Sequence, residues 1–153
     1  MQQLFTATAL MEYQKLKSIG YLTGKAHGLI KSRAQSYLDQ NNIPLKMELF
    51  PIVNTLWKED NISQQAIAEI LGYDRHRISR MIDELEKLGW VKRNPHPDNR
   101  RENLVALTKM AKDKEKAIDH ALSSAIDDAL KGMTSEERKQ IVGSLIKIIQ
   151  NLR

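Results

Sequence analysis

The alternation of apolar and polar residues between Asn61 and Thr108 predicts two short helices followed by a β-hairpin. Ser63 precedes the first apolar face and is suited to cap that helix, and Gly72 ends it. Asp74 is the expected cap of the second helix, which ends at Gly89. The residues expected to face the core at helical spacing are Ala66, Ile67, Ile70 and Leu71 in the first helix and Ile78, Met81, Ile82, Leu85 and Leu88 in the second.

The polar face of the second helix carries its positive charge in the first two turns. Its members are Arg75, His76, Arg77, Ser79 and Arg80. Helices that enter the DNA major groove read base edges with their N-terminal residues, and arginine can bond a guanine edge or a phosphate. The pattern therefore predicts a DNA-recognition helix, and an ordinary solvated helix face is the alternative.

Strand character over Trp90–Arg93 and Leu104–Leu107 predicts a hairpin whose loop is stiffened by two prolines. Arg100 and Arg101 follow the tip of this loop. A cation held on a stiff loop suits the narrow, electronegative minor groove of DNA. We expect Arg93, at the base of the hairpin, to be structural, and a plain surface hairpin is the alternative to a DNA-binding one.

The stretch of about fifty residues from Ile62 to Thr108 resembles the MarR family of bacterial transcriptional regulators, including its SlyA-type members. The matching pieces are SQQAIAEILG, RISRMIDELEKLGWVKR and PDNRRENLVALT. Asp98 and Arg100 fall on the Asp-x-Arg motif of the family's wing, and Leu107 and Thr108 fall on its Leu-Thr pair. Where the family usually has glycine three residues later, this chain has Ala111.

The resemblance implies a homodimer that binds double-stranded DNA at an inverted repeat, with interlocked chain ends. It also implies a response to a small aromatic or phenolic anion, bound between the dimer helices and the DNA-binding part. A pocket for such an effector needs an aromatic wall and a cation. Tyr21, His27 and Trp57 are the candidates for the wall, with Lys31 or Arg33 as the cation. For each of them, a place in the core or on the solvated surface is the alternative.

Helical patterns also flank the central stretch. We expect helices over Thr8–Gln40, Leu45–Lys58 and Thr108–Lys131, with Pro51 distorting the first turn of the second. Gly20, Gly24 and Gly28 recur every four residues and favour close helix packing, and a weakened middle of the helix is the alternative. The expected inward positions of the third helix are Ala111, Ile118, Leu122, Ala125, Ile126 and Ala129.

The last helix begins at a capping box of Thr134 and Glu137. Its apolar seam consists of Ile141, Leu145, Ile148 and Leu152, widened by Val142, Ile146 and Ile149. A seam this wide predicts a partner helix. The expected fold is mainly α: a winged helix-turn-helix lobe over 45–107, with a small hairpin wing, and a dimerisation lobe of long helices over 1–41 and 108–153.

Composition agrees with one domain-sized unit of 153 residues. The net charge of +5 and the pI of about 9.4 suit a protein that meets phosphates. The chain has no cysteine, which excludes thiol redox sensing and cysteine-ligated zinc. Without a signal peptide or an apolar run of membrane-spanning length, the sequence predicts a cytoplasmic protein with no membrane partner.

The sequence gives little support to an enzyme. His27, His76, His96 and His120 lack metal-ligand spacing, and there is neither a glycine-rich phosphate loop nor a GxSxG elbow. We expect no catalysis and no cofactor. A metal-responsive regulator and a winged-helix protein-interaction module remain the alternatives to an effector-responsive DNA-binding repressor.

Overall fold

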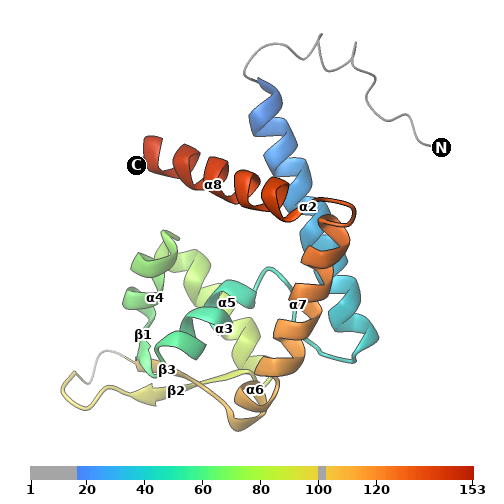
Figure 1. Cartoon of the computed structure of the whole chain (residues 1–153). Coiled ribbons are helices and arrows are strands. Elements are labelled where there is room, and N and C mark those ends of the chain that lie inside the picture. The colour runs from blue at the N-terminus through green and yellow to red at the C-terminus, as the bar shows by residue number, and fades with distance from the viewer. Residues whose placement is uncertain (1–16, 100–102) are drawn as a thin grey trace.

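The computed structural model describes residues 17–99 and 103–153, which form a mainly helical molecule with one small sheet (Figure 1). The order of elements, with their bounds, is α2 (Lys17–Gln40), α3 (Phe50–Lys58), β1 (Ile62–Ser63), α4 (Gln64–Leu71), α5 (Arg75–Lys87), β2 (Val91–Pro95), β3 (Asn103–Leu107), α6 (Lys109–Asp113), α7 (Glu115–Ala129) and α8 (Ser135–Asn151). This order confirms the mainly α, winged helix-turn-helix fold expected from the sequence.

The sheet is antiparallel, with β3 in the centre between β1 and β2. Val91 pairs with Leu107 at the base of the β2–β3 hairpin, and Pro95 pairs with Asn103 towards its tip. The base is buried and the tip is exposed. The hairpin is therefore anchored in the core at one end and projects into solvent at the other, as a wing (Figure 1).

One hydrophobic cluster joins the winged part, from α3 to β3, to helices α2 and α7. Trp90 lies fully buried in it, and its indole Nε1 donates a hydrogen bond to the carbonyl of Pro44 at 3.1 Å. The same cluster includes Leu38 from α2 and Ile118 from α7. Helices α2 and α7 are thus packed on the winged part through a common core.

Helices α2 and α7 lie side by side, joined by polar contacts at their surface. Asp128 accepts a hydrogen bond from the Tyr37 hydroxyl at 2.8 Å and pairs with Arg33 at 3.4 Å. The hydrogen bond to Asp128 raises the pKa of Tyr37 above its ordinary value. Together with the shared core, these contacts fix the crossing of the two helices.

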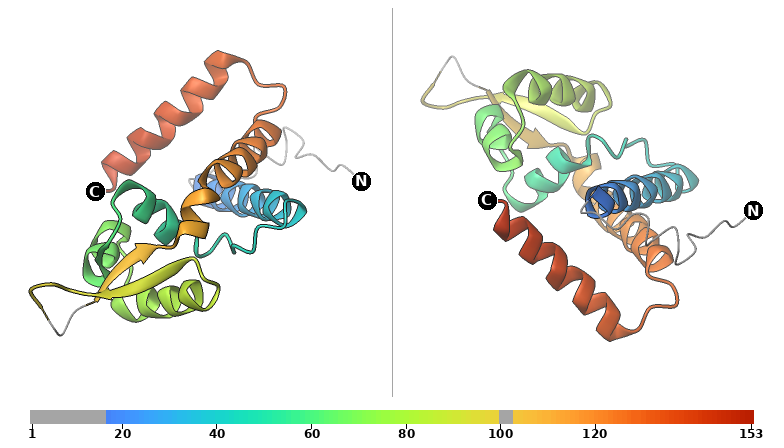
Figure 2. Two further views of the ribbon diagram at one scale, coloured as in Figure 1. Left: turned by 90° about the horizontal axis from the view of Figure 1, so that it is seen from below. Right: turned by 90° about the horizontal axis from the view of Figure 1, so that it is seen from above.

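Helix α8 leaves this assembly as a separate arm (Figure 2). The predicted capping box is confirmed: the Thr134 hydroxyl accepts from the backbone of Glu137, whose carboxylate accepts from the backbone of Thr134. None of its residues is buried. Its large exposed apolar residues are Ile141, Val142, Leu145, Ile146, Ile149 and Leu152.

The helix predicted over Leu45–Lys58 is shorter than expected, because α3 begins only at Phe50. The preceding turn is held instead by Gln35 of α2, whose amide oxygen accepts from the backbone N–H of Met47 at 2.8 Å. Pro51 lies in the first turn of α3. A first-turn residue needs no intrahelical N–H bond, so Pro51 fits the start of the helix rather than distorting it.

Other helical expectations also need correction. The single helix expected over Thr108–Lys131 is two, α6 and α7, which meet at Lys114. Ile70 is 56% exposed, and Ile126 and Ala129 are exposed too. Ala121, which was not expected inside, is buried. Part of the helix expected from Thr8, residues 8–16, lies outside the described residues.

The glycine stripe of α2 does not serve close packing within the described chain. A Cβ built at any of its positions would meet nothing within 4 Å; these are Gly20, Gly24 and Gly28. The prediction of a close helix approach was therefore wrong for the contacts between described residues.

Candidate nucleic-acid interface

Two side-chain caps and one glycine fix the turn between α4 and α5. The Ser63 hydroxyl caps α4 by accepting from the backbone N–H of Ala66 at 3.1 Å. Gly72 then adopts φ +64°, a left-handed conformation that is costly for residues with a Cβ. The Asp74 carboxylate caps α5 by accepting from the backbone N–H of Arg77 at 2.9 Å. All three roles predicted from the sequence are confirmed.

Helix α5 has the two faces that its sequence predicts. Its core face is buried and consists of Ile78, Met81, Ile82 and Leu85. On the other face Arg75, His76, Arg77 and Arg80 are exposed, and Ser79 is half-buried. Leu88, expected in the apolar stripe, is the C-cap and is exposed. The basic residues are therefore available to a partner at the N-terminal half of the helix.

Helix geometry adds to the positive character of this end. The unpaired N–H groups of a first helical turn carry a partial positive charge, which favours anions. The Asp74 carboxylate at this end is used as the cap. Hydrogen bonds from the backbone N–H of Arg77, and to a lesser degree from that of His76, hold the pKa of Asp74 below its ordinary value. The cap thus stays ionised at neutral pH.

Two of the arginines on α5 are ordered by neighbours that the sequence analysis did not single out. The Arg75 guanidinium donates to the side-chain oxygen of Gln65 on α4, and Gln65 in turn donates to Glu69 at 2.7 Å. The Arg77 guanidinium lies over the ring of Tyr73, with its Cζ 3.7 Å from the ring centroid. The only local signal was the presence of an aromatic residue four positions before an arginine.

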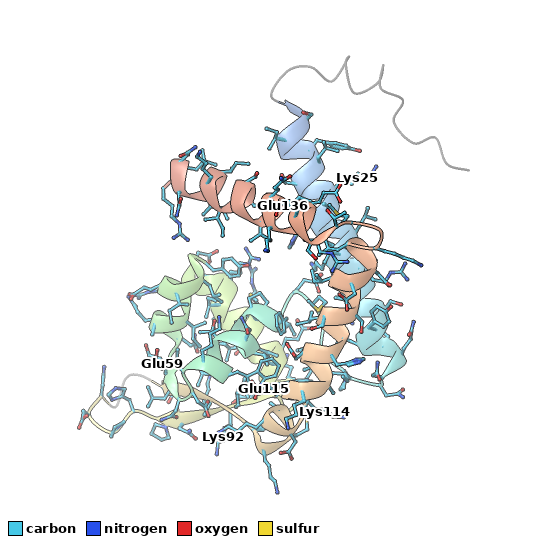
Figure 3. All side chains as sticks on the ribbon, viewed as in Figure 1. Lys25, Glu59, Lys92, Lys114, Glu115 and Glu136 are labelled. Carbon is cyan, nitrogen blue, oxygen red and sulfur yellow. The ribbon has the colours of Figure 1, made fainter. Side chains whose placement is uncertain are left out.

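The wing lies along the same edge of the molecule as α5, on the side away from α8 (Figure 2). Lys92 of β2, labelled in Figure 3, is exposed there. Near the tip, the backbone N–H of Asp98 donates to Nδ1 of His96 at 3.1 Å. The predicted wing cations Arg100 and Arg101 lie outside the described residues, so their approach to DNA stays a prediction.

Arg93 joins the wing to α5, and its predicted structural role is confirmed. Its guanidinium pairs with Asp83 at 2.5 Å and also with Glu86, both on α5, and it donates to Gln64 of α4 at 3.3 Å. Its side chain is only 21% exposed. These contacts pair the guanidinium of Arg93 within the chain and hold the wing against α5.

Asp60 braces the other side of the sheet. Its carboxylate accepts from the backbone N–H of Leu107 at 2.8 Å and pairs with Lys112 of α6 at 2.6 Å. Burial raises the pKa of Asp60, but the hydrogen bonds from Lys112, Leu107 and Asn61 outweigh that effect and leave the pKa below its ordinary value. This ionised carboxylate ties the end of the wing to the helix that follows.

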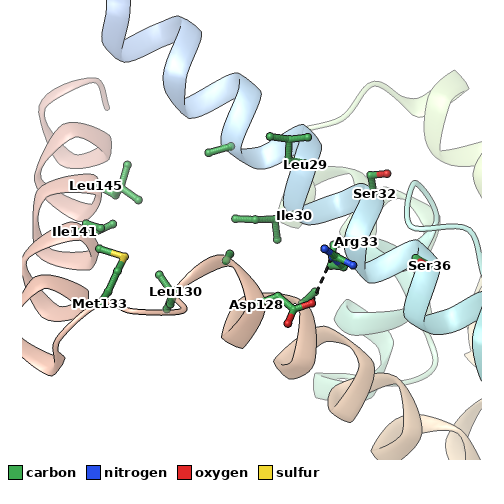
Figure 4. Close-up of a pocket in the computed structure, with 13 residues that line it drawn as sticks. Leu29, Ile30, Ser32, Arg33, Ser36, Asp128, Leu130, Met133, Ile141 and Leu145 are labelled. Carbon is green, nitrogen blue, oxygen red and sulfur yellow. Dashed lines mark ion pairs between the residues drawn. The ribbon is translucent and has the colours of Figure 1, made fainter. Parts of the chain in front are cut away.

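The structure does not gather the predicted effector residues around its large cavity. The cavity, of about 840 Å³, lies between α2, α7 and α8 and is mainly apolar, with an Arg33–Asp128 ion pair at one end (Figure 4). Of the effector candidates, only Arg33 lines it. Trp57 packs edge-on against Phe50 instead, with ring centroids 6.0 Å apart.

The remaining effector candidates have other surroundings. Tyr21 lies beside Lys25, whose Nζ is 5.6 Å from the ring centroid, and His27 is exposed on the same helix. Lys31 pairs with Glu48 at 2.6 Å. In residues 17–99 and 103–153, no three histidine, cysteine or acidic residues are grouped to hold a metal ion. The described helices include none with the length and apolar character to cross a membrane.

Together, the capped turn, the two-faced helix α5 and the β2–β3 hairpin define a winged helix-turn-helix protein. Residues 45–103 match the model of the MarR family. Over this segment, the chain is similar to the MarR family.

Comparison with individual proteins gives the extent of the likeness. The chain is 24% identical over 101 residues to YdgJ, an uncharacterized HTH-type transcriptional regulator of Bacillus subtilis (strain 168). That alignment covers 66% of this chain and 62% of YdgJ, which is less than two thirds of the relative's length.

Solved structures share the fold over more of the chain. A MarR transcriptional regulator from Methanosarcina mazei Go1 superimposes with a TM-score of 0.77 at 21% identity, covering 90% of each chain. Reduced AbfR, solved bound to DNA, superimposes with a TM-score of 0.70 at 19% identity, covering 97% of this chain and all of AbfR. At these identities, the likeness shows a common fold.

Proposed function

We propose that the protein regulates transcription by binding double-stranded DNA at a specific sequence. One observation carries this proposal: the exposed basic half of α5 and the wing share one edge of the molecule (Figure 2). A winged helix-turn-helix uses these two elements to enter adjacent grooves of the duplex. The names of the similar proteins, which are transcriptional regulators of the HTH or MarR type, and the DNA bound to AbfR support the same function.

In the proposed complex, α5 lies in the major groove and the wing reaches the adjacent minor groove. The residues proposed to approach the major groove are Arg75, His76, Arg77, Ser79 and Arg80. Arg100, supported by Arg101, is proposed to approach the minor groove. The intramolecular ion pairs of Arg93 leave it as the support of the wing rather than a contact to DNA.

The proposed functional unit is a homodimer in the cytoplasm. An apolar stripe on α8 stays largely exposed in the described chain, and none of its residues is buried. Burying it against a second copy removes that surface from water. A two-fold axis would then present two α5 helices to an inverted repeat in the operator.

The regulator is proposed to be a repressor that responds to a small aromatic or phenolic anion. The support is the resemblance to the MarR family, together with an apolar cavity beside a cation, Arg33. The residues first named for the pocket, Tyr21, His27 and Trp57, do not line that cavity. Binding of substituted benzoates and phenols, followed by the change in DNA affinity, tests this part of the proposal.

The DNA-binding proposal is tested with a duplex selected by the wild-type protein from a random library. Arg77→Ala should weaken binding to that duplex by about 1–3 kcal/mol if Arg77 reads a base edge, and much less on random DNA. Fluorescence anisotropy on both duplexes measures the difference. Lys116→Ala on α7 removes one exposed charge outside α5 and the wing, and serves as the control.

Two results would count against the proposal. An equal loss on both duplexes would reduce Arg77 to a phosphate contact. If the library yields no preferred sequence and the wild-type protein binds every duplex alike, sequence-specific regulation is wrong.

A further inference from the structure

We infer that Tyr73 is a positioning residue for base recognition, because its ring holds the Arg77 guanidinium ready to bind a guanine edge. This inference rests on the proposed function and adds to it the residue that sets the selectivity of one arginine. Its basis is the stack of the Arg77 Cζ 3.7 Å from the centre of the Tyr73 ring. A cation over an aromatic face at this distance is attracted by the ring quadrupole.

Backbone hydrogen bonds and core packing hold both partners of the stack in place. Gly72 reverses the chain at φ +64°, and the backbone N–H of Tyr73 then donates to the carbonyl of Ala68 at 3.1 Å. The Tyr73 side chain is half-buried and packs on the hydrophobic core. The backbone of Arg77 is held by the Asp74 cap. The ring therefore lies on a rigid support directly beneath the guanidinium.

The stack leaves the useful part of Arg77 open. Stacking occupies the flat face of a guanidinium, whereas its N–H donors point outward from the edge. Among the residues that the structure describes, none makes a hydrogen bond or ion pair with the Arg77 side chain. The donors are thus available in the fork geometry that matches O6 and N7 of guanine.

The other arginines of α5 differ from Arg77. Arg75 already donates to Gln65, whose amide is oriented by its own bond to Glu69. Arg80 is exposed and interacts with Asp74 only through space; among the described residues it has no hydrogen bond, ion pair or ring stack. Arg77 alone in this trio combines a supported face with an unoccupied edge among the described contacts. Ordering a long side chain before binding lowers the entropy lost in the complex.

A double-mutant cycle tests the inference on the duplex selected by the wild-type protein. Tyr73→Leu removes the aromatic face but keeps an apolar side chain, and should weaken binding about two- to five-fold. Tyr73→Phe keeps the face and should bind within about two-fold of wild type. In the Arg77→Ala background, Tyr73→Leu should cause no further loss, because the group that the ring positions is gone.

The same duplexes carrying 7-deazaguanine at one position at a time add a chemical readout. This base lacks the N7 acceptor, so the guanine bound by Arg77 should reveal itself as a position where wild-type affinity falls. That fall should be smaller in Tyr73→Leu and absent in Arg77→Ala. A general structural role for Tyr73 would instead lower affinity without changing the response to 7-deazaguanine.

A measurement without DNA separates this inference from the proposed function. In wild type and Tyr73→Phe, the Arg77 Hδ protons should show upfield ring-current shifts in NMR spectra that are lost in Tyr73→Leu. If these shifts are present but the protein selects no DNA, the stack exists and the proposed function is wrong, and with it the role in base reading. If the protein selects DNA but Tyr73→Leu binds like wild type, or loses equally with and without Arg77, the inference is overturned and the proposed function stands.

Discussion

Arg93 offers a direct test of how the wing is held on the recognition helix. Replacing it with methionine keeps an apolar stem of similar length and removes the guanidinium. The change breaks the pairs with Asp83 and Glu86 and the hydrogen bond to Gln64. It also leaves two carboxylates three residues apart on α5 without their shared cation.

The expected loss follows from the exposure of the partners. Asp83 is 51% exposed and Glu86 is 41% exposed, so each pair is worth about 0.2–1 kcal/mol. The hydrogen bond to Gln64 adds about 0.5–1.5 kcal/mol. We therefore expect Arg93→Met to lower the free energy of unfolding by about 1–3 kcal/mol. Arg93→Lys should fall in between, because a single ammonium cannot replace the planar fork.

Equilibrium unfolding in urea, followed by circular dichroism, measures this loss. Lys92→Met is the matched control, since Lys92 is the exposed neighbour on the same strand, and it should stay within about 0.5 kcal/mol of wild type. Repeating both in 1 M salt should narrow the difference between Arg93→Met and wild type through screening. If Arg93→Met unfolds at the same urea concentration as Lys92→Met, the ion pairs of Arg93 do not stabilise the fold.

Three further predictions concern other parts of the chain. The double variant Leu145→Lys, Ile148→Lys should sediment as monomer or aggregate and should lose binding to palindromic DNA. The control Gln140→Lys, on the opposite face of α8, should stay dimeric. If the double variant remains a dimer, the interface lies elsewhere. Arg100→Ala should weaken DNA binding broadly and lower the salt slope by about 1 without changing the melting temperature; an unchanged slope would show that the wing does not touch DNA. Because the folded pKa of Asp60 is lowered, its ionisation stabilises the fold above the unfolded pKa of about 4, and this contribution is lost as the pH falls through the folded pKa. Asp60→Asn should therefore be clearly less stable than wild type at pH 7, and the two should become equally stable in acid. A difference in unfolding free energy that does not change with pH would refute this.

The parts of the fold that were predictable are those with local causes. A hydroxyl or carboxylate before an apolar run marks a helix start, and this rule placed Ser63, Asp74 and Thr134 correctly. The two faces of α5 followed from helical spacing in the same way. These features depend on residues within one or two turns of each other, which the sequence displays directly.

The errors lie where distant packing decides. No proline or glycine marks the division between α6 and α7 at Lys114. Tyr73 and Arg77 are only four residues apart, but Tyr73 lies before the N-cap Asp74 and outside α5, so helical spacing does not predict the stack of its ring on Arg77. The lining of the cavity depends on how three helices cross, and aromatic content alone selected Trp57, which packs against Phe50 instead.

The lack of self-burial on α8 links regulation to protein concentration. A helix of 17 residues with an apolar stripe is marginal in water when nothing covers it. In the proposed dimer, the order of this arm therefore depends on mass action: the melting temperature should rise as the protein is concentrated. The number of copies in the cell would then set both the occupancy of the operator and the fraction of chains whose last helix is folded. Operator occupancy would therefore rise more steeply with newly synthesised protein than it would for a permanently assembled dimer.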